Sequence, residues 1–338
     1  MKLRLTLGVV VTLLLWTSAP AQPSLPGAPP FILIAQGAWG TAVDKAAAEG
    51  YVVMMGHPLN SFLILRRAAE GEPPAVYKFI GGKKDLEREL ARGYRFVPGT
   101  LDVAVTGDPM LLALQVNDPA TREMLIIEAM RASTLDNKIL EARTKGFRVL
   151  GLASSGDGHA AVLERPAGAP AGSLTIDPKA YVAQKGKDAV QQALAASAAA
   201  GYRVEQATAF NEMRLVLERR EGEPPVEYRV LAATRNQTLA EQINAAAAEG
   251  FSVTPGTLHA VQKGSLFGTQ RLGSEYMVVM QKAPGAVPGP EYYVVGARRR
   301  STLTSEFDAA VAAGWAPLAV VIGFQEQDTL VLFERPRR

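Results

Sequence analysis

Hydrophobic and polar positions follow two periods that take turns along the chain. In longer stretches the apolar residues recur at three- and four-residue spacings, which places them on one face of a helix. In the short stretches between, apolar and polar residues alternate, which is typical of a strand with one buried face. A glycine followed by an aromatic residue divides each helical stretch from the next strand. These pairs are Gly50-Tyr51, Gly93-Tyr94, Gly146-Phe147, Gly201-Tyr202, Gly250-Phe251 and Gly314-Trp315.

The six glycines are predicted to stop six helices. Glycine adopts the left-handed conformation that ends many helices at little steric cost, and we expect it at Gly250, in the stretch NAAAAEGFSV of residues 244–253. The apolar residues seven positions earlier mark the buried helix faces: Val43, Leu86, Ile139, Leu194, Ile243 and Phe307. The second helix is expected to be one turn shorter than the others. Thr238 and Glu241 predict a capping box at the start of the fifth helix.

Each repeat therefore reads β-α-β-β, and the predicted fold class is α+β. We expect antiparallel three-stranded sheets in the order 2-3-1, each covered on one face by one helix, with half-buried second strands. Pro317 predicts an edge position for the second strand of the last unit, because proline donates no ladder hydrogen bond. A lone unit of this size buries little apolar surface, so the units are expected to pair.

Longer internal matches group the six units into two halves. EGEPPAVY at residues 70–77 returns as EGEPPVEY at 221–228, and PGTL at 98–101 returns at 255–258. These offsets indicate that three units were duplicated. The first half is expected to span residues 31–166, with units of about 31–74, 75–120 and 121–166, and residues 167–178 form a linker. The second half spans residues 179–338, with units of about 179–225, 226–284 and 290–338.

Residues 1–21 are interpreted as a bacterial signal peptide, followed by a proline-rich linker at 22–30. Lys2 and Arg4 precede an apolar run too short to span a bilayer, and Ala21 ends a small-residue cleavage pattern. We therefore expect a periplasmic or secreted protein with no transmembrane segment after signal removal; an uncleaved anchor is the alternative. Losing both basic residues lowers the formal charge from +3 to +1, which gives no support for nucleic-acid binding. The chain has no cysteine.

The sequence offers little catalytic chemistry. His57, His159 and His259 fall at positions that look non-equivalent, and none has a nearby ligand at metal-binding spacing. No nucleophile elbow or phosphate-binding loop occurs. Asp85, Glu87 and Glu89 are interpreted as a solvated helix face. We expect no catalytic residue, no cofactor and no metal.

Two surface features are weak candidates for binding. Basic residues occupy the turn that enters the helix in five of the six units: Lys83, Lys84, Arg131, Lys185, Lys187, Arg235, Arg298, Arg299 and Arg300. Helix N-termini attract anions, so a shared rim of such turns would suit an anionic partner; ordinary soluble loop residues are the alternative interpretation. Leu266 and Phe267, in a long loop at residues 263–275, are either a partner contact or a lid folded onto the sheet.

The repeat resembles small bacterial β-α-β-β proteins that are known only as domains of unknown function. Their centre reads like LNxxxxEGW, and the nearest copies here are Ile243-Asn244 with Glu249-Gly250-Phe251, and Gly314-Trp315. The resemblance could cover all six units, and it implies neither a reaction nor a cofactor.

These observations favour an exported, non-catalytic repeat protein that binds or scaffolds another protein or an envelope component. The alternative is a periplasmic protein that binds a small molecule or anion between repeats, and an uncharacterised enzyme is third. The oligomeric state and the partner are not indicated by the sequence.

Overall fold

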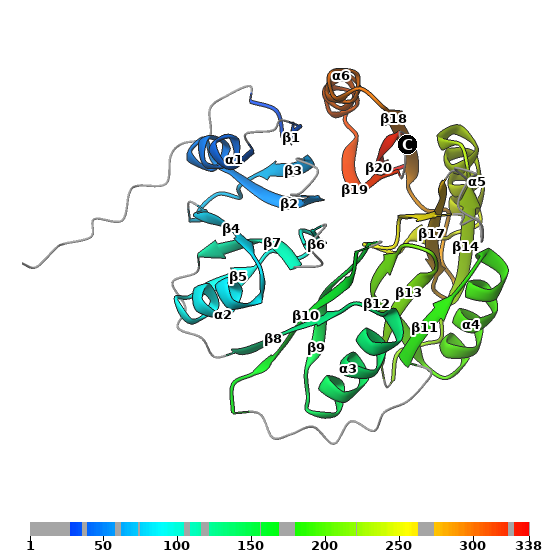
Figure 1. The fold of residues 1–338 in the computed structure, drawn as a ribbon. Helices are drawn as coiled ribbons and strands as arrows, with labels where there is room; N and C mark the ends of the chain where they lie inside the picture. The colour runs from blue at the N-terminus through cyan, green and yellow to red at the C-terminus, as the bar shows by residue number, and fades with distance from the viewer. Residues whose placement is uncertain are drawn as a thin grey trace, which may run out of the picture.

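The computed structural model describes most of the chain, and the units within it form a ring (Figure 1). The described residues are 28–35, 39–57, 62–73, 75–104, 109–115, 122–155, 157–168, 180–220, 222–262, 274–323 and 328–337. The expected signal peptide, most of the linker at 167–178, and Leu266 and Phe267 lie outside them.

The first three units follow one another from the N-terminal side. Unit 1 contains β1 (Phe31–Ile34), α1 (Trp39–Ala48), β2 (Tyr51–His57) and β3 (Phe62–Arg67). Unit 2 contains β4 (Tyr77–Gly81), α2 (Lys83–Ala91), β5 (Tyr94–Phe96), β6 (Asp102–Val103) and β7 (Pro109–Gln115). Unit 3 contains β8 (Arg122–Ala129), α3 (Ala132–Thr144), β9 (Arg148–Ser154) and β10 (His159–Pro166).

The other three units repeat the same order. Unit 4 contains β11 (Tyr181–Gln184), α4 (Lys187–Ala199), β12 (Tyr202–Ala209) and β13 (Met213–Arg219). Unit 5 contains β14 (Glu227–Ala233), α5 (Asn236–Ala248), β15 (Ser252–Val253), β16 (His259–Gln262) and β17 (Ser274–Lys282). Unit 6 contains β18 (Glu291–Ala297), α6 (Arg300–Ala312), β19 (Ala316–Ile322) and β20 (Thr329–Arg335).

The predicted α+β class and strand order are confirmed. In every unit the last strand lies between the first and second strands and is antiparallel to both, as in β1-β3-β2 and β18-β20-β19. β19 is an edge strand, as Pro317 predicted, and its register with β20 shifts between Pro317 and Ala319. In units 2 and 5 the second strand is broken into two pieces, so these sheets have four strands.

Each sheet lies between two helices, its own and the helix of the preceding unit. In β18, Tyr292 and Val294 join the core of unit 5, whereas Val295 and Ala297 pack with α6 of their own unit. This arrangement corrects the expectation of half-buried second strands, since Val52 and Arg203 are only 8% and 6% exposed. Period-two alternation is incomplete here because both sheet faces are covered.

The ring closes where unit 6 packs on unit 1. α6 contacts β1, β19 contacts β2, and one hydrophobic core contains Leu33 and Ile64 of unit 1 together with Phe307 of unit 6. Across the same junction, Cζ of Arg300 in α6 lies 5.4 Å from the ring centroid of Phe62 in β3. Units therefore do not merely pair: each described unit packs on two neighbours through shared cores.

The helix stripe read from the sequence forms the cores. The residues seven positions before the glycines are all at most 1% exposed: Val43, Leu86, Ile139, Leu194, Ile243 and Phe307. The six glycines that follow the helices have φ between +83° and +95°, the region that disfavours any residue with a Cβ. At Gly250 the backbone is also crowded, because an added Cβ would lie 2.9 Å from the carbonyl oxygen of Ala286.

The capping box predicted at Thr238 and Glu241 is wrong. α5 begins at Asn236 and its N-cap is Arg235, so Thr238 lies inside the first turn. Glu241 instead accepts a hydrogen bond from the side-chain amide of Gln237, at 3.1 Å. The helix starts earlier than the hydroxyl residue indicated, because the strand before it leads straight into the turn.

Candidate functional site

The two ends of each sheet carry different chemistry. The first and second strands are both antiparallel to the third, so they run in the same direction and their carboxyl ends lie at the same end of the sheet. We call this end the turn edge, because the turn into the helix and the hairpin to the third strand both lie there. The opposite end, with the helix C-terminus and the glycine–aromatic pair, is the cap edge. Each of the six units contributes one turn edge to the ring, and we call the basic residues at these edges the basic rim.

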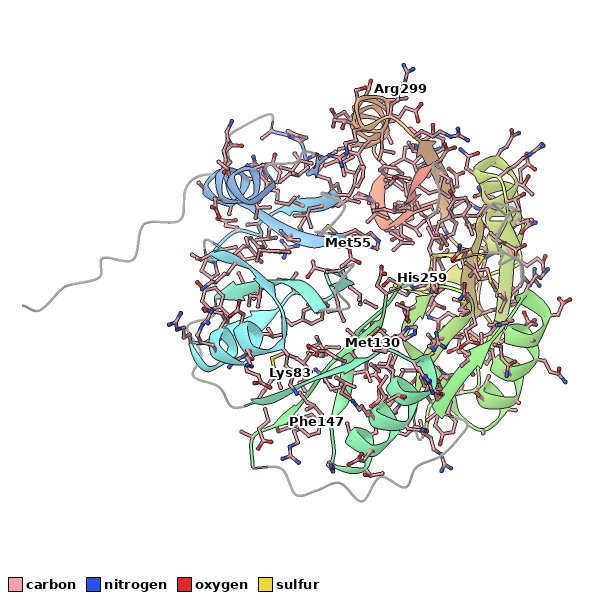
Figure 2. The ribbon with its side chains drawn as sticks, viewed as in Figure 1. Met55, Lys83, Met130, Phe147, His259 and Arg299 are labelled. Atoms are coloured by element: carbon pink, nitrogen blue, oxygen red, sulfur yellow. The ribbon has the colours of Figure 1, made fainter. Side chains whose placement is uncertain are left out.

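The structure places the predicted basic residues at the turn edge. Lys83, Lys187 and Arg300 are the first residues of their helices, and Arg131, Arg235 and Arg299 are N-caps. These N-caps make no side-chain capping hydrogen bond, so they leave the helix N–H groups to other partners. Figure 2 shows Arg299 on the outer side of the ring, at the start of α6.

Acidic neighbours balance only part of this basic rim. Nε of Arg298 lies 3.5 Å from a carboxylate oxygen of Asp328, and Nζ of Lys83 lies 3.9 Å from one of Glu87. Both pairs are largely exposed, so each contributes little to stability. The side chains of Arg131, Arg235 and Arg299 are exposed. The rim could therefore attract an anionic surface, with helix N-termini adding to the positive potential.

A polar cluster lies buried at the junction of units 3 and 4, and sequence reasoning missed it. Arg214 of β13 is 3% exposed at a core position that Phe62, Met277 and Leu330 fill in other units. Its Nε lies 3.5 Å from Oδ1 of Asp136 in α3, and it forms a second ion pair with Glu212. The hydroxyl of Tyr181 donates a hydrogen bond to the same Asp136 oxygen. The arginine stands out only when the third strands of the units are aligned by strand register, because the aligned position is apolar in those other units.

Burial shifts the pKa of several groups in this cluster. Burial raises the pKa of Asp136, and burial together with the hydrogen bond to Asp136 raises that of Tyr181. His159, 9% exposed at the start of β10, has its pKa lowered by burial and next by Arg214. Its Nδ1 and the Oγ of Ser154, the residue opposite it in β9, have no hydrogen-bond partner within the described part of the chain. The serine–histidine relay of a nucleophilic enzyme is therefore not formed here.

The second strands bring two histidines and an aspartate to equivalent positions toward the middle of the ring, and this corrects the interpretation of all three histidines as non-equivalent. The register pairs are His57 with Phe62, Asp102 with Met110, and His259 with Met277. These partners occupy the same place in their third strands. In units 2 and 5 the second strand is interrupted by a loop, so more residues separate the glycine from this position than in unit 1. Counting residues from the glycine therefore does not reveal that the positions are equivalent. Figure 2 shows His259 on the inner side of the ring.

The polar residues of this inner layer make separate contacts. Nδ1 of His57 lies 4.0 Å from Oδ2 of Asp102. Nε2 of His259 lies 2.9 Å from the carbonyl oxygen of Gly256, and burial lowers the pKa of His259 to about 4. Among the residues that the structure describes, no group of three histidine or acidic side chains is placed to hold a metal ion.

One acidic residue of the second helix is also not the solvated side chain that the sequence suggested. Asp85 and Glu87 are exposed, but Glu89 is 1% exposed. Nζ of Lys78 lies 2.7 Å from its carboxylate and Arg88 and Arg92 contact the other oxygen, so the hydrogen bond from Lys78 leads in lowering the pKa of Glu89 to about 2. These partners come from the strand and helix of unit 2 and stabilise that unit.

The cap edge has a repeated contact between a cation and the aromatic residue that follows the glycine. Cζ of Arg335 lies 4.1 Å from the ring of Trp315, and Cζ of Arg165 lies 4.6 Å from the ring of Phe147. Both arginines also pair with a glutamate of the first strand, Arg335 with Glu291 at 2.8 Å. The sequence could have indicated this contact, because a basic residue lies at the end of the third strand in these units. These groups are mutually satisfied and serve the packing of each unit.

Grooves open between a helix and the first strand of a sheet, in one case the sheet of the next unit and in another the helix's own sheet. One, of about 600 Å³, lies between α4 and β14 and is lined by Gln191, Ala195, Tyr228 and residues 282–285, among others. The other, of about 340 Å³, lies along β8 and α3 and also includes Lys83 of α2.

Comparisons with known proteins add no family to this geometry. A scan against protein-family models finds no match, and a search of curated proteins finds none either. In the part of the chain that the structure describes, no helix has the length and apolar character needed to cross a membrane.

Proposed function

We propose that the protein is an exported, non-catalytic binding module whose basic turn edges contact an acidic partner surface. The observation that carries this proposal is the ring itself. In a ring of six similar units, a partner that spans several units can contact basic turns from separate parts of the sequence, since five of the six turns carry basic residues. Repetition multiplies weak contacts, and several contacts on one partner bind more strongly than any one of them.

The chemistry of the described site also favours binding over catalysis. Arg214, buried at the junction of units 3 and 4, forms ion pairs with Asp136 and Glu212. Its positive charge is therefore neutralised inside the protein. In the basic rim, Arg298 and Lys83 each have one exposed acidic neighbour, and the side chains of Arg131, Arg235 and Arg299 are exposed. Surface charges of this kind act mainly by raising the association rate and by selecting partners of opposite charge. Because a signal peptide is expected at residues 1–21, we propose that this binding occurs outside the cytoplasm, in the periplasm or the medium.

The test compares two charge-matched variants. The rim variant carries Arg298→Ser, Arg299→Ser and Arg300→Ser. The control variant carries Lys45→Ser, Arg219→Ser and Arg220→Ser, which removes the same charge from exposed positions near the cap edge. Binding of labelled polyglutamate and of inorganic polyphosphate is measured against ionic strength. We expect the rim variant to bind about tenfold more weakly with a smaller salt dependence, and the control to keep most of its binding. Equal losses in both variants would reject a role for the rim.

A further inference from the structure

The first strand of unit 3 borders a groove, and the helix that precedes this strand is short. α2 has 9 residues, whereas α3, α4, α5 and α6 have 13 each. A missing turn at the start of α2 shortens the cover over the carboxyl end of β8. Met130, directly after β8, is 76% exposed. The exposure of this large apolar side chain is consistent with the end of β8 not being covered by α2.

At two other junctions the same strand edge is closed by a side-chain amide. Gln191 of α4 donates to the carbonyl oxygen of Tyr228 and accepts from the N–H of Val230, both at 2.8 Å. Asn244 of α5 donates to the carbonyl oxygen of Tyr292 at 2.8 Å and accepts from its N–H at 2.9 Å. These bonds show which backbone groups of the first strand point away from its own sheet. They also protect an edge that could otherwise pair with another strand.

In β8 the equivalent groups belong to Met124 and Ile126. Glu123 pairs with Arg165 as Glu227 pairs with Lys282, which aligns Met124 with Tyr228 and Ile126 with Val230. The helix position that holds Gln191, ten residues before the glycine, is Lys83 in α2. A lysine can donate to a carbonyl group but cannot accept from an N–H group. Within the described residues, the one side-chain hydrogen bond to the backbone of β8 runs from Lys138 to Glu128, at 3.1 Å.

The groove along this edge is lined with lysines. Lys83, Lys138 and Lys145 border it, together with Glu128, Glu141 and the strand residues 125–127. Glu141 is paired with Lys145 at 2.7 Å. Lys83 comes from α2 and Lys138 from α3, and both side chains are exposed. Lys83 has one exposed acidic neighbour, Glu87, at 3.9 Å, and Lys138 donates to the carbonyl oxygen of Glu128.

From this arrangement we infer that β8 accepts an extended, acidic peptide segment of a partner protein as an added strand. The peptide backbone would pair with the outward groups of Met124 and Ile126, and its carboxylates would meet Lys83 and Lys138. A second copy of this chain suits the edge less well, because an antiparallel β8–β8 pair would bring the two sets of lysines together. The inference rests on the proposed function, since it names the partner class for one part of the rim.

The experiment uses the full mature chain and two labelled eight-residue peptides. Both peptides alternate threonine and glutamate, and one is N-methylated at every second residue so that one edge of its backbone cannot donate. Fluorescence anisotropy at low salt is expected to show binding of the first peptide below about 1 mM and at least about fivefold weaker binding of the second. Equal binding of the two peptides, or no binding at 1 mM, would overturn strand addition.

A protein variant tests the site itself. Lys83→Gln introduces at this position the residue that closes β14, and it is expected to weaken the first peptide about fivefold or more. Lys84→Gln removes the same charge from the neighbouring exposed position and should have a smaller effect. If Lys83→Gln and Lys84→Gln behave alike, the peptide is bound by general charge and the inference fails. A peptide-independent dimer in sedimentation that Lys83→Gln abolishes would assign the edge to a second copy and would also overturn it.

The outcomes separate this inference from the proposed function. If the Arg298–Arg300 rim variant loses polyglutamate binding while N-methylation has no effect, the binding module stands and strand addition fails. If N-methylation and Lys83→Gln matter but the rim variant binds polyglutamate normally, β8 is a strand-addition site and the wider rim has no role.

Discussion

Replacing Gly250 with alanine adds one Cβ atom, which tests both the left-handed helix stop and the close backbone packing at Ala286. Gly250 has φ of +95°, and its ideal Cβ would lie 2.9 Å from the carbonyl oxygen of Ala286 and 3.3 Å from that of Val287. Gly201 and Gly314 are matched controls. They follow helices in the same way, with φ of +83° and +84°, but nothing lies within 4 Å of an added Cβ at either position.

The expected cost has two parts. A left-handed conformation costs a residue with a Cβ about 1–2 kcal/mol, and all three variants should show this part. At Gly250 the new methyl group must also displace a backbone carbonyl by several tenths of an ångström. Steric overpacking of this kind typically costs about 1–3 kcal/mol, so Gly250→Ala should lose roughly 2–5 kcal/mol in total. The segment that would have to move is held by its own contact, since the N–H of Gly289 donates to the carbonyl oxygen of Ala247 at 2.7 Å.

Urea unfolding followed by far-ultraviolet circular dichroism, with thermal melting as a second measurement, provides the comparison. Gly250→Ala should have the lowest midpoint, and Gly201→Ala and Gly314→Ala should lie between it and the unmodified protein. If all three variants are equally destabilised, the close approach at Ala286 is wrong. If none is destabilised, the left-handed helix stop itself is refuted.

Two further predictions concern contacts between units and pH. Asn244→Ala removes both hydrogen bonds to the backbone of Tyr292 and should lower the free energy of unfolding in urea by about 1–3 kcal/mol. The control, Gln237→Ala on the exposed side of α5, should lower it much less. Equal losses in the two variants would contradict a role for the Asn244 amide at the junction. Burial, and next the carboxylate of Glu218, raises the pKa of Glu205 to about 7 from 4.5, so the folded state holds a proton there that the unfolded state releases. The stability from this group is present below about pH 4.5 and is lost as the pH rises through 7, by up to about 3 kcal/mol. Glu205→Gln should therefore flatten the dependence of the free energy of unfolding on pH between pH 5 and 8. The control Glu241→Gln should leave that dependence unchanged. If the slope in Glu205→Gln equals that of the unmodified protein, the raised pKa of Glu205 is rejected.

The repeat unit could be predicted because its signals are local. An apolar residue seven positions before each glycine faces the sheet whatever the neighbouring units do, since helix periodicity alone sets its direction. Pro317 likewise predicted an edge strand from the missing N–H of proline. The strand order followed from the need to place three short strands in one antiparallel sheet beside a single helix.

The failed predictions involve residues whose environment comes from elsewhere in the chain. Glu89 looked like one of several surface carboxylates, but Lys78 from the preceding strand pairs with it and its side chain is buried. Thr238 matched a capping pattern, yet the path of the chain out of β14 starts the helix at Asn236. His57 and His259 looked unrelated because spacing counts residues, whereas strand register counts paired positions.

The sequence by itself determined the β-α-β-β unit, its helix-stopping glycines and the number of repeats, because hydrophobic period and backbone freedom act over a few residues. Only the tertiary structure decided that the units close into a ring and that both faces of each sheet are covered. It also decided that Arg214 meets Asp136 in the interior and that Lys83 of unit 2 borders the same groove as β8 of unit 3. These features depend on which units become neighbours, and that choice is made by packing across the whole chain.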